Sequence, residues 1–159
     1  MSKQMWGLLV ACLTWSNVFA ADSYGSWAAR YSCKIKILKP FSATGAATIE
    51  LKNSQVEAID VFLVFPSKDR LSSSCSIGSS RGDNQSKWTE TAGVTQVEFT
   101  NGVFVHDEGD WTRISRTRNG FLVEFSNMLG HGNCGAAAEL PESVFVPLNS
   151  KMCKAKVHR

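Results

Sequence analysis

The chain has 159 residues, of which 43% are hydrophobic and 19% are charged, and its formal net charge is +3. This length suits one domain with its own core, and an apolar content this high with so small a charge excludes an intrinsically disordered chain. No apolar run approaches the roughly 20 residues of a membrane-spanning helix, so no transmembrane segment is expected. The pI near 8.6 comes without clustered lysine and arginine, so no nucleic-acid partner is expected either.

Residues 1–20 have the layout of a secretory signal peptide. Lys3 supplies a basic start, residues 5–15 are apolar, and residues 18–20 place small side chains at a cleavage site. We therefore predict cleavage after Ala20 and a periplasmic or secreted location.

The mature chain is then a single domain over residues 21–159, and the loss of one lysine lowers its formal net charge from +3 to +2. The alternative is a lipoprotein, because residues 9–12 have the form of a lipobox ending at Cys12. Apolar sequence continues past Cys12, which favours the cleaved signal peptide.

Four cysteines remain in the predicted mature chain, and an even number in an exported protein indicates two disulfides. Three pairings are possible. We favour Cys33–Cys75 with Cys134–Cys153, because the second pair flanks a stretch that could double back as adjacent strands. A zinc site is excluded by the spacing, since no two of these cysteines lie two to four residues apart.

Strict alternation of apolar and polar residues predicts two half-buried strands near the start of the domain. Residues 31–37 place Lys34 and Lys36 on one face and apolar side chains on the other. Residues 47–52 repeat the pattern after a turn expected at Gly45.

The next segment, residues 61–65, is continuously apolar and ends at Pro66. This composition favours a central strand that is covered on both faces. Residues 72–86 are rich in serine, glycine and aspartate and are expected to be mostly loop.

Two Asn-Gly pairs, at residues 101–102 and 119–120, lie between apolar segments and predict β-hairpins. The first predicts a two-residue turn. At the second, a two-residue turn would set Arg116 opposite Val123, whereas a three-residue loop would set Ser115 opposite Val123. This second register is left open.

The rest of the chain reads as further strands over residues 121–125, 134–140, 143–148 and 152–158. No segment after residue 20 sustains a helical period. We therefore predict an all-β protein, an antiparallel sandwich or closed barrel of roughly eight to ten short strands.

The densest polar cluster is residues 106–110, and a second histidine lies in the Gly-rich segment 130–133. His106, Asp107 and His131 could bind a metal or serve as acid and base, which defines one alternative function, a metal-dependent or hydrolytic envelope enzyme. The simpler interpretation is an acidic turn after a strand. No hydrolase, zinc-protease or phosphate-loop motif occurs in the sequence, so we predict no enzymatic activity and no cofactor.

Arg113, Arg116 and Arg118 bracket one predicted strand and its turn and could bind an acidic partner. The alternative for these arginines is an ordinary solvated strand face. Trp27, Trp88 and Trp111 could be core residues or interface anchors, and the core interpretation is preferred.

The C-terminal part of the chain combines a strand at 121–125, a Gly/His/Asn loop and cysteine at 130–134, a segment at 136–140, and a closing cysteine strand at 152–157. This pattern resembles the C-terminal part of small periplasmic lysozyme inhibitors. It also resembles periplasmic immunity proteins that neutralise cell-wall hydrolases delivered by rival bacteria. The resemblance implies an exported, disulfide-bonded β-protein with a loop that fills the cleft of a hydrolase.

The chain departs from the lysozyme-inhibitor pattern in two respects. The inhibitory Ser-Gly-x-x-Tyr-like loop has its nearest counterpart at residues 76–79, which lack the tyrosine. A positively charged chain would also encounter basic lysozymes slowly. An immunity protein fits the charge better, because its targets vary in charge.

We therefore predict an exported, non-enzymatic protein that binds and inhibits another protein. The preferred target is a peptidoglycan-degrading enzyme. Besides the enzyme already described, the other alternative is a structural or adhesion subunit of the envelope, with an incomplete sheet that accepts a donated strand. Long loops between strands carry function. The candidate partner contacts are Ser76, Gly78, Ser79, Arg81, Asp83, Arg113, Arg116, Arg118, Gly130, His131 and Asn133.

Overall fold

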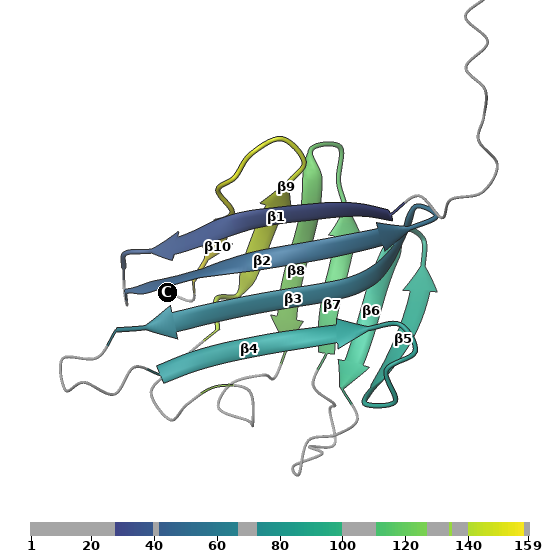
Figure 1. Ribbon diagram of the computed structural model, residues 1–159, viewed down its shortest axis with the longest axis horizontal. Coiled ribbons are helices and arrows are strands. Elements are labelled where there is room, and N and C mark those ends of the chain that lie inside the picture. Colours follow the sequence, from purple (N-terminus) through teal and green to yellow (C-terminus); the bar gives the residue numbers. More distant parts are fainter. Residues whose placement is uncertain are drawn as a thin grey trace, which may run out of the picture.

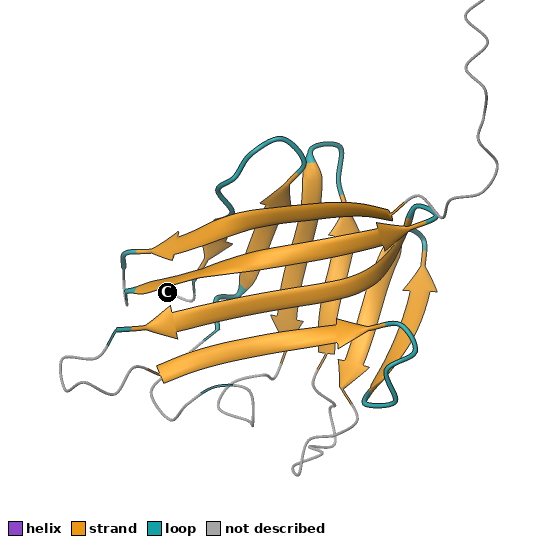
Figure 2. Ribbon diagram, viewed as in Figure 1, coloured by secondary structure: helices purple, strands orange, loops and turns teal. Residues whose placement is uncertain are grey.

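The computed structural model describes residues 28–39, 42–66, 73–99, 111–126, 134 and 140–157. Within these ranges the chain forms strands and turns and no helix (Figure 2). The all-β prediction is therefore confirmed, and ten strands in two antiparallel sheets make a sandwich rather than a closed barrel. The described residues contain no helix that is long and apolar enough to cross a membrane.

The first sheet is a four-stranded meander whose spatial order follows the chain. Its strands are β1 (Ala28–Ile37), β2 (Ala43–Lys52), β3 (Gln55–Phe65) and β4 (Ser73–Ser80). The predicted alternation in β1 is confirmed, because Cys33, Ile35 and Ile37 are buried whereas Lys34 and Lys36 are exposed. One face of this sheet therefore meets the core and the other meets solvent.

The second sheet has six strands, also in chain order. They are β5 (Ser86–Thr91), β6 (Val94–Phe99), β7 (Trp111–Arg116), β8 (Gly120–Ser126), β9 (Ser143–Pro147) and β10 (Lys154–Lys156). Its strands cross those of the first sheet at a steep angle, as in an orthogonal sandwich (Figure 1). The core fills the space between the sheets, where the rings of Tyr31 and Phe121 pack with their centroids 5.4 Å apart.

Two expectations for the first sheet are wrong. Residues 61–65 do belong to an interior strand, but only one face is covered: Leu63 is fully buried whereas Phe62 is 42% exposed. Gly45 lies inside β2 and forms no turn. Gly45 and residues 61–65 each lie within a strand, and the neighbouring strands and sheet determine which of their side chains are covered.

The serine-rich segment 72–86 is also not mostly loop, since Ser73–Ser80 forms β4. Cys75 and Ile77 alternate with serines along β4 and are buried against the core. Ser74, Ser76 and Ser80 lie on the solvent side. The period-two pattern is thus present, but the polar composition concealed it.

The two-residue turns of the described chain lie where no Asn-Gly pair predicts them. Asn53-Ser54 connects β2 to β3, and Ala92-Gly93 connects β5 to β6. All four residues have positive φ, at 52°, 66°, 50° and 79° in chain order. Positive φ at both central positions is the signature of a type I′ hairpin turn, which matches the twist of the flanking strands.

The hairpin at residues 119–120 has neither of the two predicted registers. Arg116 pairs with Phe121 and Ile114 pairs with Val123, so the loop is one residue longer than the longer alternative. The N–H of Thr117 closes this loop by donating to the carbonyl of Gly120 at 2.8 Å. The other Asn-Gly pair, at residues 101–102, lies outside the described residues.

The disulfides join Cys33 to Cys153 and Cys75 to Cys134, so the predicted pairing is wrong. Cys33 and Cys75 lie in β1 and β4, on opposite edges of the first sheet with two strands between them. Neighbouring strands are about 4.8 Å apart. The two cysteines are therefore much farther apart than the roughly 7 Å between Cα atoms that a disulfide tolerates.

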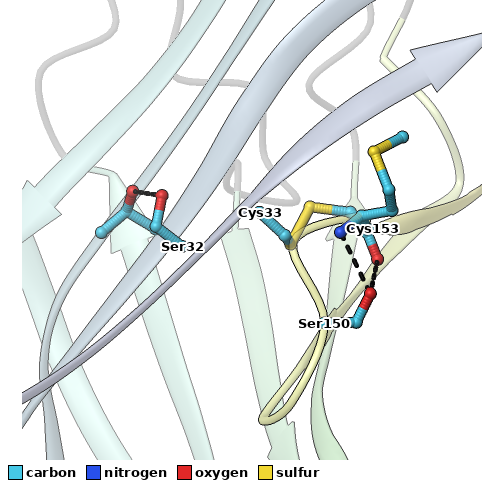
Figure 3. Close-up of a disulfide and its surroundings, with 6 residues drawn as sticks. Ser32, Cys33, Ser150 and Cys153 are labelled. Atoms are coloured by element: carbon cyan, nitrogen blue, oxygen red, sulfur yellow. Dashed lines mark hydrogen bonds between the residues drawn. A yellow bond between two sulfur atoms is a disulfide. The ribbon is translucent and has the colours of Figure 1, made fainter.

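Each disulfide instead ties one edge of the first sheet to the second half of the chain. Beside β1, the N–H of Lys34 donates to the carbonyl of Lys151 at 2.8 Å, and the N–H of Cys153 donates to the carbonyl of Lys34 at 2.9 Å. These bonds bring Cys33 and Cys153 together (Figure 3). At the other edge, Cys75 forms a β-bridge with Cys134.

The C-terminal strand is shorter than predicted. Only Lys154–Lys156 is strand, although Cys153, Ala155 and Val157 do pack against the core as the alternation predicts. Residues 143–147 form the predicted penultimate strand. Of the strand expected over 134–140, only Cys134 and Leu140 are described.

Candidate functional site

The outer face of the six-stranded sheet gathers large polar and aromatic side chains. In β7, Thr112 and Ile114 are buried in the core, so the alternate residues Trp111 and Arg113 point outward. Cross-strand pairing extends this outward row over β6, β8 and β9. The surface, called the Trp111 face below, comprises Gln96, Glu98, Trp111, Arg113, Leu122, Glu124 and Phe145.

Arg113 occupies the centre of the Trp111 face. It is paired across the strands with Gln96 on one side and Glu124 on the other. Its guanidinium carbon lies 4.5 Å from the centre of the Trp111 ring, a cation–π contact, and its Nη2 donates to Gln96 Oε1 at 3.5 Å. Gln96 in turn donates to Glu98 at 3.1 Å.

This arrangement holds the planar cation of Arg113 over the flat ring of Trp111 on the outside of the sheet. Within the described part of the chain Arg113 forms no ion pair, so its charge is available to a carboxylate. Tryptophan and arginine are the residue types most enriched at the energetic centres of protein interfaces. The Trp111 face therefore has the chemistry of a protein-binding surface.

Of the three tryptophans, Trp27 lies outside the described residues, and the core interpretation is right for Trp88 but not for Trp111. Trp88 packs against the core, and its Nε1–H donates to Ser79 at 3.2 Å and to Ser86 at 3.0 Å. Trp111 lies on the outside, opposite Glu98 and Ser126. Trp111 therefore belongs to the outer surface of the sheet and not to the core.

A cleft of 420 Å³ opens next to the Trp111 face, and Phe145 belongs to both. The cleft lies between the loop that connects β7 to β8 and the segment that connects β9 to β10. This cleft, called the β9 cleft below, is lined by Arg118, Asn119, Phe145, Pro147, Leu148, Asn149, Ser150, Met152 and Lys154.

One wall of the β9 cleft is fixed by the C-terminal disulfide. Ser150 Oγ accepts from the N–H of Met152 at 3.1 Å and donates to its carbonyl at 3.3 Å (Figure 3). The next residue, Cys153, is bonded covalently to Cys33 in β1. The backbone of this wall is therefore held in place.

The opposite wall is fixed by backbone contacts. The carbonyl of Asn119 accepts from the N–H of Leu148 at 3.0 Å. A Cβ on Gly120 would lie 2.3 Å from the carbonyl oxygen of Val146 and 2.8 Å from the Phe145 ring. The glycine therefore permits the close approach of β8 to β9.

The candidate residues around Arg81 form a structural corner between the sheets. Arg81 Nε donates to the carbonyl of Val56 at 2.7 Å, its guanidinium forms an ion pair with Glu90, and it lies 5.2 Å from the ring centre of Trp88. Asp83 accepts from the N–H of Gln85 at 2.9 Å. These side chains are occupied by contacts that hold the turn.

The other candidates are divided between the two sheets. Ser76 and Gly78 are on the solvent side of β4, whereas Ser79 faces inward and is buried. Arg118 lines the β9 cleft next to the Trp111 face. Arg116 has the inward parity of β7 and lies exposed at its end, so it does not join Arg113.

Several candidates lie outside the described residues: His106, Asp107, Gly130, His131 and Asn133. Among the residues that the structure describes, no group of three or more histidine, cysteine or acidic side chains could hold a metal ion. The sequence missed the Trp111 face and most of the β9 cleft, because their residues come from several strands and from the segments that connect them, and meet only in the folded sheet.

Comparison of the chain with protein-family models, with curated proteins and with solved structures found no match.

Proposed function

We propose that this chain is an exported, non-enzymatic protein that binds and inhibits another protein, and that its target is a peptidoglycan-degrading enzyme. The observation that carries the proposal is the Trp111 face. It presents an aromatic ring and a cation without an ion-pair partner among the described residues, at the centre of a cross-linked sheet.

A rigid surface of this kind suits tight inhibition. Side chains that are already held by cross-strand contacts lose little conformational entropy when a partner binds, so more of the contact energy appears as affinity. Arg113 is held by Trp111 and Gln96 before any partner arrives. Leu122 and Phe145 add apolar area in the adjacent row of the same face.

The two disulfides support a location outside the cytoplasm, because such bonds persist in oxidising compartments. The signal-peptide pattern of residues 1–20 supports export through the secretory route to the periplasm or beyond. A protein in that compartment can meet cell-wall hydrolases at their place of action.

The choice of a cell-wall hydrolase as target is supported by the resemblance of the C-terminal segments to lysozyme inhibitors and periplasmic immunity proteins. The charge favours the immunity role. A chain with a formal net charge of +2 after export would be repelled by a basic lysozyme, and such repulsion lowers the rate of encounter.

An inhibition titration tests this function. Oxidised protein that begins at Ala21 is added to a panel of muramidases, peptidoglycan amidases and peptidases, and wall lysis is followed by turbidity. We expect one class to be inhibited at an equimolar ratio, and acidic enzymes to be inhibited in preference to basic ones.

Lysis that continues unchanged across the whole panel would contradict the proposal. Metal analysis of the same preparation, with His106→Ala as a variant, addresses the alternative enzyme. Bound metal at one equivalent that is lost in the variant would favour that alternative over inhibition.

A further inference from the structure

The β9 cleft carries a positive charge that no described residue of its lining neutralises. Its lining includes Arg118 and Lys154 and no acidic side chain. Neither cation has an ion-pair partner among the described residues, whereas Lys156, on the same strand as Lys154, is paired with Glu142. The two cations of the cleft are thus available to a ligand.

Part of the lining of the cleft is apolar. Phe145 and Pro147 come from β9, and Leu148 and Met152 follow in the connecting segment. Met152 is 48% exposed, so it offers apolar surface to a ligand in the cleft. Apolar contact and cation charge therefore occur together in one concavity of 420 Å³, a volume within the range of ligand sites.

We propose that the β9 cleft binds an acidic segment of the partner protein, with carboxylates held by Arg118 and Lys154 and an adjacent apolar side chain packed against Phe145 and Met152. This inference rests on the proposed function and adds the chemistry of the partner. The occupant is a peptide segment, because the cleft also presents the amide groups of Asn119 and Asn149, which can bond to a peptide backbone.

The position of the cleft supports the same occupant. Phe145 lies in the row that continues through Leu122 to Ser115, so a segment in the cleft would extend onto the Trp111 face. Both walls are fixed in advance, by the disulfide of Cys153 and by the bond from Leu148 to Asn119. Binding would then require little reorganisation of this chain.

The test uses the oxidised protein that begins at Ala21, labelled with nitrogen-15, and a capped peptide in which leucine is flanked by two glutamates. A peptide with glutamines in place of the glutamates is the control ligand. We expect saturable shifts at the amides of the cleft with a dissociation constant of about 1 mM or below, and about tenfold weaker binding of the control.

Lys154→Glu should weaken binding of the acidic peptide by about tenfold, since it replaces an attraction by a repulsion. Lys36→Glu is the matched control, because it changes the net charge equally at an exposed lysine on the other sheet. We expect it to alter binding by less than about twofold. Both variants should unfold at the temperature of the unmodified protein.

Equal binding of the two peptides, or an equal loss in the two variants, would overturn the proposal. The result is separable from that of the inhibition titration. Hydrolase inhibition without peptide binding would refute only the proposal that the β9 cleft binds an acidic segment. Binding of the acidic peptide without inhibition of any hydrolase would refute only the proposed function.

Discussion

Replacing Cys33 and Cys153 together by serine will lower the free energy of unfolding by about 4 to 5 kcal/mol. The two cysteines are 120 residues apart, so the bond restricts most of the unfolded chain, and the chain-entropy model gives an effect of this size for so long a loop. Domains have total stabilities of roughly 5–15 kcal/mol. The variant will therefore lose a large part of its stability, as denaturant titration can measure.

A matched double variant separates the observed pairing from the pairing that the sequence suggested. Cys33→Ser with Cys75→Ser removes one partner from each observed bond and leaves Cys134 and Cys153 as free thiols. Alkylation should find these thiols and should find none in the first variant. If the variant with Cys33→Ser and Cys75→Ser had no free thiols and were more stable than the first variant, the observed pairing would be contradicted.

Gly45→Ala will lower the free energy of unfolding by about 3 kcal/mol or prevent folding. Gly45 pairs with Leu63 in the middle of the first sheet. A Cβ at this position would lie 1.8 Å from the carbonyl oxygen of Phe62 and 2.8 Å from its carbonyl carbon. Because backbone atoms cannot rotate away as a side chain can, β2 and β3 would have to separate.

Gly78→Ala is the control for this substitution. Gly78 lies in a strand of the same sheet, and its nearest neighbour would be a carboxylate oxygen of Asp60 at 3.5 Å, an ordinary contact. We expect its stability to change by less than about 0.5 kcal/mol. Similar unfolding midpoints for the two alanine variants would show that β2 and β3 do not approach as described.

The strands of this protein could be predicted from the sequence wherever apolar and polar residues alternate. In β1 the lysines alternate with buried isoleucines, and the pattern alone defines the strand. In β4 the same period is present, but serine and glycine surround Cys75 and Ile77, and that composition is typical of a loop. In β4 the composition predicts a loop and the alternation predicts a strand. The segment is a strand, with Cys75 and Ile77 buried.

Partnerships across the sheets could not be predicted, because they depend on strand order. The disulfides follow the edges of the first sheet, where Cys33 and Cys75 are separated by β2 and β3. The Asn-Gly pair at 119–120 is a strong hairpin signal, yet its glycine is needed for contact with β9. No local pattern contains that contact.

The candidate site could be predicted only in part, because it too depends on the order of the strands. Arg113 and Arg118 were identified from their residue type, and they lie on the Trp111 face and in the β9 cleft. Trp111 was expected in the core, because the sequence does not show which side of β7 it occupies. Only the burial of Thr112 and Ile114 determines that side.

We propose that the inhibited enzyme binds the Trp111 face and not the outer face of the first sheet. The most direct measurement compares the inhibition constants of Trp111→Ala and Phe62→Ala against that enzyme. Phe62 is the matched control, because it is an aromatic residue 42% exposed on the outside of the other sheet.

Loss of an interface tryptophan typically costs about 2 kcal/mol or more of binding energy. We therefore predict that Trp111→Ala raises the inhibition constant by about 30-fold and that Phe62→Ala changes it by less than about twofold. The opposite pattern, with Phe62→Ala weakening inhibition and Trp111→Ala leaving it unchanged, would show that the enzyme binds the first sheet and not the Trp111 face.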